Sequence, residues 1–362
     1  MHPSPHPPVR IGVVGAGFMG RQHVALIRRH PEARLVGIAD PAAASARSSA
    51  EAEYGCAVHA DLDGLLAAGG VDAVVIASPN ATHVAAALTA LQAGVAVLVE
   101  KPIAPRFDDA GLLVAAAEAP GARLLVGHHR RHHPAIGRAR DALRTGAIGR
   151  LVAFSGMWAA RKDDAYFADI PWHTRPGAGV MLINLVHDLD LMRHLAGEVV
   201  EIQAMTSTTV RELDVEDSVS IGVRFASGAL GSFLATDAGV SPWGWDQATE
   251  ESAEFPFVPG AVAYRLTGTE GALSIPDLAH FTYATGVPPH WHSPLSRSFL
   301  PVSPRNSFAA QLDHFVDVAR ALADPLVTAA DAARTLALVE AAARSAREGR
   351  AVAVDAGVSA AP

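Results

Sequence analysis

Lys101 is the residue of this chain whose surroundings best suit acid–base chemistry. It stands between Glu100 and Pro102, and this charged group ends an aliphatic run, residues 95–99, that is typical of a buried strand. A lysine in a poorly solvated site beside a cationic ring loses its proton more readily, which suits a general base. A solvated lysine at the start of a helix is the alternative, and position alone does not decide between them.

A glycine motif near the start of the chain indicates dinucleotide binding. Gly15, Gly17 and Gly20 form G-x-G-x-x-G between an apolar strand and a helical segment. The first glycine permits a tight turn, the second lets a pyrophosphate approach the backbone, and the third lets helix and strand pack closely. Asp40 ends the next strand, where a carboxylate can accept hydrogen bonds from a ribose and would repel the 2′-phosphate of NADP. The motif predicts NAD rather than NADP, with a nucleotide-free turn as the alternative.

Two further polar segments are expected at the same edge of the sheet. In doubly wound sheets, ligands bind beyond the carboxyl ends of the strands. The tripeptides "SPN" (78–80) and "EKP" (100–102) each follow such a strand. The predicted cofactor-binding residues are Gly15, Gly17, Phe18, Met19, Gly20, Asp40, Ser78, Pro79, Asn80, His83, Glu100, Lys101 and Pro102.

His187 is the second candidate for proton transfer. Its helical segment, residues 179–197, is apolar almost all round, so the imidazole is expected to be buried and to need hydrogen-bond partners. Asn184 and Asp188 are close to it on such a helix and could share its face. A core histidine bonded to a backbone carbonyl is the alternative.

The segment before this helix mixes polar and aromatic side chains, as a pocket for a hydroxylated ligand does. The predicted substrate-binding residues are Lys101, His129, Arg161, Tyr166, Trp172, His173, Asn184, His187 and Asp188. The run "HHRRHH" (128–133) raises the possibility of a metal site, but Pro134 argues against a helix that would align the imidazoles. We therefore expect no metal.

The elements that must position these residues change character along the chain. Five apolar strands, within 9–17, 34–40, 71–79, 95–102 and 122–129, alternate with helical segments, which indicates a parallel sheet covered on both faces. After about residue 150, apolar and polar residues alternate between glycine turns, as in antiparallel strands. We predict an α/β protein with an N-terminal Rossmann doubly wound parallel sheet and a C-terminal α+β domain with a large open, mainly antiparallel sheet. The expected division is a flexible tail (1–8), a dinucleotide-binding domain (9–127) and a domain for substrate binding and oligomerisation (128–362).

The composition argues against several classes of partner. The 362 residues are 50% hydrophobic and carry a formal net charge of -8, which does not suit nucleic-acid binding. The single cysteine cannot form an internal disulfide, which fits a reducing compartment. The start of the chain does not read as a signal peptide, and no apolar run reaches membrane-spanning length without polar interruption. We expect a cytoplasmic protein without nucleic-acid or membrane partners.

Several blocks of the chain resemble the Gfo/Idh/MocA oxidoreductases, the glucose-fructose oxidoreductase and inositol dehydrogenase group. They are "GVVGAGFMGRQH", "ASPNATHVAAALTALQAGVAVLVEKPIA", "VGHHRRHHP" and "GAGVMLINLVHDLDLMRHLAG". The resemblance implies hydride transfer on sugars, cyclitols or related polyols, in dimers or tetramers. The family's lysine matches Lys101 and its helix histidine matches His187, whereas Ile183 occupies the place of its aspartate and Asn184 follows one residue later.

These observations together predict an NAD(P)-dependent oxidoreductase that acts on a secondary alcohol or ketone of a sugar or polyol, as a homodimer or homotetramer. Lys101 or His187 would remove the hydroxyl proton as the hydride leaves. Two alternatives stay open. One is an oxidation–elimination glycosidase or epimerase that recycles tightly bound NAD, and the other is a non-catalytic dinucleotide sensor.

Overall fold

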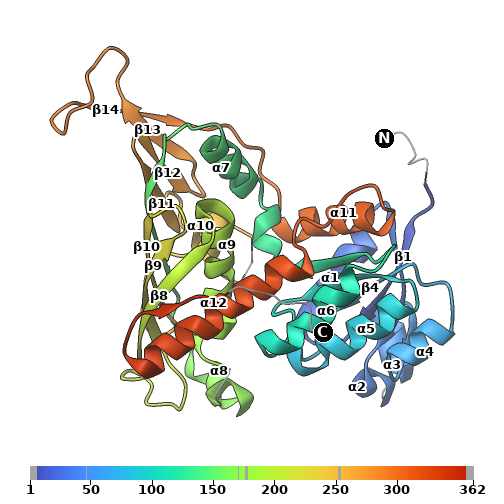
Figure 1. Ribbon diagram of the computed structural model, residues 1–362. Coiled ribbons are helices and arrows are strands. Elements are labelled where there is room, and N and C mark those ends of the chain that lie inside the picture. Colours follow the sequence, from blue (N-terminus) through green and yellow to red (C-terminus); the bar gives the residue numbers. More distant parts are fainter. Residues whose placement is uncertain (1–5, 46, 170, 176–177, 252–253, 356–362) are drawn as a thin grey trace. The chain divides into compact units, whose positions relative to one another are not determined.

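Each of two units of the chain has a β-sheet of its own in the computed structural model (Figure 1). The structure describes residues 6–45, 47–169, 171–175, 178–251 and 254–355. Of these, residues 6–129 and 308–336 belong to the first unit, and the remainder, 130–307 and 337–355, to the second.

The sheet of the first unit has six parallel strands in the order β3-β2-β1-β4-β5-β6. They are β1 (Val9–Val14), β2 (Ala33–Ala39), β3 (Ala57–His59), β4 (Ala73–Ile76), β5 (Ala96–Glu100) and β6 (Leu124–Gly127). Strands β4, β5 and β6 are buried along their whole length, as strands covered on both faces must be. The predicted doubly wound Rossmann sheet is confirmed. The structure adds a sixth strand to the five predicted, because β3 is a three-residue edge strand with little apolar pattern of its own.

The helices of the first unit follow the strands along the chain. They are α1 (Phe18–Arg29), α2 (Pro41–Ser45), α3 (Arg47–Tyr54), α4 (Leu62–Ala67), the 3-10 turn η1 (Asn80–Thr82), α5 (His83–Gln92) and α6 (Phe107–Ala117). Two helices from the end of the chain also contribute: most of α11 (Ser307–Ala319) and the first part of α12 (Ala329–Glu348).

The return of residues 308–336 to the first unit differs from the predicted division, which assigned them to the second. The backbone N–H of Val126 donates to the Val327 carbonyl at 3.1 Å, and Arg123 Nη1 donates to the Ala319 carbonyl at 2.9 Å. Phe315 of α11 is fully buried in the first core. An apolar stripe shows that a helix covers a sheet but not which sheet, so the sequence did not reveal this return.

The sheet of the second unit has nine strands in the order β14-β13-β12-β11-β7-β10-β9-β8-β15. They are β7 (Leu151–Ala159), β8 (Val199–Ser207), β9 (Ser218–Phe225), β10 (Leu230–Thr236), β11 (Tyr264–Gly268), β12 (Gly271–Ile275), β13 (Ala279–Tyr283), β14 (Leu295–Phe299) and β15 (Val352–Ala353). Strands β7 and β10 pair in parallel and the other neighbours pair antiparallel. The predicted large, mainly antiparallel sheet is confirmed.

The second unit has a core that contains Trp158, Trp245 and Tyr264, and several of its helices contribute to it. The helical elements of this unit are η2 (His129–His132), α7 (Pro134–Arg144), α8 (Asp164–Ala168), η3 (Pro171–Thr174), the π-helix η4 (Met181–Leu185), α9 (Val186–Ala196), α10 (Trp245–Thr249) and the end of α12. The first residue of η2, His129, belongs to the first unit. Gly197, at φ +95°, ends α9 as predicted. Across the described ranges, no helix combines the length and the apolar character needed to cross a bilayer.

Candidate functional site

The glycine motif forms the turn between β1 and α1. Gly15 has φ +94°, a left-handed conformation that favours glycine. A Cβ on Gly20 would lie 1.9 Å from the Gly15 carbonyl oxygen, so only glycine permits this closeness of helix and strand. A Cβ on Gly17 would have no atom within 4 Å, which leaves open space over the loop. These three environments fit the roles predicted for a dinucleotide-binding loop.

The N-terminus of α1 is suited to an anion. Gly17 is its N-cap residue, and within the described part of the chain no side chain caps this end of the helix. The first N–H groups of a helix lack intrahelical acceptors, and the helix dipole favours negative charge there. Phe18, in the first turn, is 62% exposed. The loop and the helix end therefore fit the pyrophosphate of a dinucleotide.

Asp40, predicted to bind a ribose, holds the glycine loop. Its Oδ2 accepts a hydrogen bond from the Ala16 N–H at 2.8 Å. Its Oδ1 accepts from the N–H groups of Ala42 and Ala43 at 2.8 and 2.9 Å, and so begins α2. The carboxylate is thus fixed beside the loop at the carboxyl end of β2.

His83 joins the two polar segments that follow β4 and β5. The imidazole is buried, and its Nε2 and Nδ1 lie 2.8 and 2.9 Å from the carbonyl oxygens of Ser78 and Pro102. Because carbonyl oxygens only accept, the ring donates to at least one of them. The Lys101–Pro102 peptide bond is cis. The predicted residues 78–80 and 100–102 therefore lie together at one edge of the sheet.

Glu100 explains why a carboxylate ends a buried strand. Its Oε1 lies 2.8 Å from Nε2 of His23, and both side chains are buried. Its Oε2 accepts from the Lys101 N–H at 3.2 Å. Burial favours the neutral acid, but the hydrogen bond and charge of His23, together with the charge and backbone N–H of Lys101, outweigh it and hold the pKa of Glu100 below its usual value. His23 was not predicted as a site residue. It lies three positions after Gly20, at the end of the block "GVVGAGFMGRQH", and this position was the only signal for it in the sequence.

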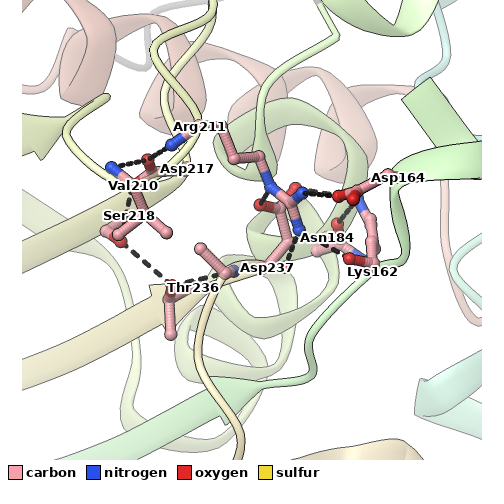
Figure 2. Close-up of polar contacts among 10 residues, drawn as sticks. Lys162, Asp164, Asn184, Val210, Arg211, Asp217, Ser218, Thr236 and Asp237 are labelled. Carbon is pink, nitrogen blue, oxygen red and sulfur yellow. Dashed lines mark hydrogen bonds and ion pairs between the residues drawn. The ribbon is translucent and has the colours of Figure 1, made fainter. Parts of the chain in front are cut away.

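In the second unit, Asn184 is held by Lys162, which was not predicted. The Lys162 Nζ donates to Asn184 Oδ1 at 2.9 Å and lies 3.2 Å from Asp237 Oδ2 (Figure 2). Lys162 follows β7 and Asp237 follows β10, and because these strands are parallel neighbours, both residues lie at the same edge. Arg211 donates to the other oxygen of Asp237 at 3.1 Å. Burial lowers the pKa of Lys162, and the Asp237 charge opposes this only in part.

Two of the predicted pocket residues pack beside this lysine. The rings of Tyr166 and His173 stack at 3.9 Å, and Lys162 Nζ lies 4.6 Å from the Tyr166 ring centre, a cation–π distance. Burial raises the pKa of Tyr166 to about 12. Arg161 is exposed and lines a neighbouring cavity of about 240 Å³. The side chain of Trp172, also predicted here, lies outside the described residues.

The buried face of α9 carries a polar network. His187 is 8% exposed and Asp188 is fully buried. The Asp188 carboxylate accepts from Arg130 Nη1 at 3.0 Å and from the Tyr264 hydroxyl. Burial raises the pKa of Asp188 to about 6, and the Arg130 charge and the Tyr264 hydroxyl offset this only in part. The prediction that Asp188 binds substrate does not agree with this placement, because successive helix residues point about 100° apart and Asp188 faces the core.

The residues 128–133 do not converge on one point. Arg131 makes a buried ion pair with Asp190 at 2.6 Å, and the His129 ring stacks on Phe308 at 3.8 Å. Within the ranges that the structure describes, no three His, Cys, Asp or Glu side chains are grouped to hold a metal ion.

No motif of the sequence singles out Lys162, but the amino-acid composition does. The chain has 27 arginines but only two lysines, Lys101 and Lys162. Arginine stays charged in proteins, whereas a buried lysine can release its proton and offers compact, tetrahedral donors. Lys162 is thus one of two positions in the chain whose cation has these properties.

Two family models match the chain, one in each unit. Residues 9–128 match an oxidoreductase family with an NAD-binding Rossmann fold, and residues 136–274 match the GFO/IDH/MocA C-terminal domain. The D-apiose dehydrogenase of Paraburkholderia graminis is 30% identical over 346 residues, which cover 94% of this chain and 88% of that protein. The chain belongs to the Gfo/Idh/MocA oxidoreductase family. The predicted resemblance is confirmed, and this Gfo/Idh/MocA protein is an NAD(P)-dependent oxidoreductase.

Other proteins similar to this Gfo/Idh/MocA member extend over nearly its full length. The inositol 2-dehydrogenase of Rhizobium meliloti is 28% identical over 355 residues, covering 96% of this chain and 99% of that protein. The WlbA dehydrogenase from Bordetella pertussis, crystallised with NADH and UDP-GlcNAcA, has a TM-score of 0.76 at 24% identity and covers 96% of this chain and 99% of its own. Both units therefore belong to the shared fold.

Proposed function

We propose that this oxidoreductase transfers a hydride between nicotinamide and a secondary alcohol or ketone of a sugar, cyclitol or related polyol. The observation that carries the proposal is Lys101 at the carboxyl end of β5, at the sheet edge of the glycine loop, with its backbone N–H bonded to buried Glu100. The relatives named inositol 2-dehydrogenase and D-apiose dehydrogenase support this substrate class.

NAD is the proposed cofactor, and NADP is less favoured. Gly15, Gly17, Gly20 and the N-terminus of α1 would hold the pyrophosphate. Asp40 would accept from a ribose hydroxyl, and its charge disfavours a 2′-phosphate. When bound, the nicotinamide supplies hydride transfer.

Lys101 is the proposed proton-transfer group. As the C–H bond of the alcohol breaks and its hydride departs, the Lys101 amine takes the hydroxyl proton, which leaves a ketone. In the reverse direction the ammonium returns that proton to the oxygen formed from the carbonyl. His187 of the second unit is the second proposed acid–base group. His129, Arg161, Tyr166, Trp172, His173 and Asn184 remain proposed substrate-binding residues, whereas Asp188 is proposed to position α9.

A homodimer or homotetramer is proposed as the assembly. Apolar side chains on β7, β8 and β10 are exposed in the single chain, with Met205 at 67% and Leu230 at 53%. Exposed apolar surface of this kind is favoured as a protein interface.

The test is a panel of monosaccharides, inositols and anhydrosugars, each assayed with NAD⁺ and with NADP⁺ at 340 nm. We expect reduction of NAD⁺ by at least one polyol and slower reduction of NADP⁺. Turnover without added dinucleotide would favour the glycosidase or epimerase that recycles its NAD. Tight NADH binding without turnover of any compound would favour the sensor.

A further inference from the structure

The side chain of Asn184 is oriented by one neighbour. Lys162 Nζ, at 2.9 Å, is its hydrogen-bond partner within the part of the chain that the structure describes. An ammonium group donates and has no acceptor, so it must face the amide oxygen. The amide NH₂ is therefore directed away from Lys162, with two donors for another partner.

The amine of Lys162 contacts three groups of the second unit. It reaches Asn184 Oδ1, lies 3.2 Å from Asp237 Oδ2 and stands over the Tyr166 ring at 4.6 Å. Arg211 holds the second oxygen of Asp237 at 3.1 Å and so keeps the carboxylate in place (Figure 2). Two acceptor oxygens and one aromatic face therefore surround the ammonium, which suits a group that fixes another residue.

Asn184 lies in the helical segment that leads into the helix of His187. It lies in the π-helix Met181–Leu185, directly before α9, and three positions before His187. Single π-helical turns of this kind are frequent at functional sites. Asn184 is partly exposed, so its NH₂ is accessible to a ligand.

We infer that Lys162 is a positioning residue that fixes Asn184 as a hydrogen-bond donor to an oxygen of the substrate. The inference rests on the proposed function. The family aspartate that Ile183 replaces could only accept hydrogen bonds when ionised, whereas Asn184 held by Lys162 donates them. The partner at this position is therefore an acceptor oxygen, such as a ketone carbonyl or a hydroxyl lone pair.

A double-mutant cycle tests this role with the polyol that gives the fastest NADH formation in the panel. Lys162→Met and Asn184→Ala should each lower kcat/KM for that polyol by about tenfold, with the KM for NAD⁺ unchanged. The double variant should be no worse than Asn184→Ala by more than about twofold, because Lys162 acts through Asn184. Additive losses would overturn the inference, since a lysine that only neutralises Asp237 costs the same with or without Asn184. Arg224→Met, which removes an exposed cation of the same unit that is paired with Glu201, is the matched control and should match wild type.

A second measurement needs no substrate. The chain has three asparagines, Asn80, Asn184 and Asn306, so protein labelled with ¹⁵N-asparagine gives three side-chain NH₂ pairs. The pair absent from Asn184→Ala identifies Asn184, and it should shift in Lys162→Met but not in Arg224→Met. An unshifted Asn184 pair overturns the inference whatever the turnover result. Failure of wild type on every polyol, with the shift present, would instead count against the proposed function alone.

Discussion

The two units build their polar sites in different ways. In the first, the glycine loop, Asp40 and the segments 78–80 and 100–102 all follow strands of one parallel sheet, so the topology alone brings them to one edge. In the second, Lys162 and Asp237 meet only because β7 and β10 form the one parallel pair of an otherwise antiparallel described sheet. A motif can therefore identify the first kind of site, whereas the second depends on strand pairing that no local pattern encodes.

The two units also differ in the protonation of their buried carboxylates, Glu100 and Asp188. In the first unit, the carboxylate of Glu100 is stabilised by buried His23 and by Lys101, whose backbone N–H donates to it, and its pKa is lowered. In the second, burial outweighs the partners of Asp188, and its pKa is raised to about 6. The first carboxylate thus stays ionised near neutral pH, while the second gains a proton in mildly acidic solution.

The largest expected effect concerns the proton-transfer role assigned to the first unit. Lys101→Met should lower kcat with the best polyol by 10²- to 10⁴-fold, in line with the usual contribution of general acid–base groups. NADH binding, followed by fluorescence titration, should change less than about twofold because the glycine loop is untouched. Turnover of the variant within tenfold of wild type would show that a group other than Lys101 transfers the proton.

Alanine substitutions at two glycines of the first unit are expected to affect stability and cofactor binding differently. Gly20→Ala places a Cβ 1.9 Å from the Gly15 carbonyl oxygen and should lower the free energy of unfolding by about 2–3 kcal/mol or more. Gly17→Ala meets no atom within 4 Å and should change it by less than about 0.5 kcal/mol, yet weaken NADH binding. Urea unfolding and NADH titration of both variants measure the contrast. Equal stability of the two would contradict the close approach of α1 to β1.

The buried network of the second unit should respond to pH. Because the pKa of Asp188 is raised, its contribution to stability is full at low pH and is lost as the pH rises through about 6. Tyr264→Phe removes a donor to the ionised carboxylate and should cost about 1–3 kcal/mol of unfolding free energy at pH 8. The cost should be smaller at pH 5, where Asp188 is protonated. Urea unfolding at both pH values measures this cost. A larger cost at pH 5 than at pH 8 would contradict the assignment of the Tyr264 hydrogen bond to the ionised carboxylate.

The smallest effect is a shift in a titration curve. Protein labelled with ¹³C at the lysine ε-carbon gives two signals, because the chain has two lysines. The signal lost in Lys162→Met should titrate below the ordinary lysine value of 10.5. Asp237→Asn should move it lower still, because the Asp237 charge favours the ammonium form. A Lys162 signal that titrates at or above the ordinary value would show that the amine is well solvated.

Much of the fold, and the place of several predicted site residues at one sheet edge, followed from local patterns. Continuously apolar strands separated by helices identified the Rossmann sheet, and alternating strands identified the antiparallel one. The motif residues Gly15 to Gly20, Ser78, His83 and Lys101 all lie at the predicted sheet edge. The placement of residues 308–336 and the burial of Asp188 did not follow, because both depend on which surfaces pack together.

The sequence by itself determined the alternation of strands and helices, the glycine turn and the charged end of β5, since each depends on neighbouring residues and on short-range sterics. Only the tertiary structure decided that His23 would meet Glu100, that Arg130 and Tyr264 would enclose Asp188, and that Lys162 would orient Asn184. Such contacts join segments far apart in the chain. A buried polar group accepts whichever partner the packing brings within hydrogen-bond distance, and the pattern around either residue does not name the other.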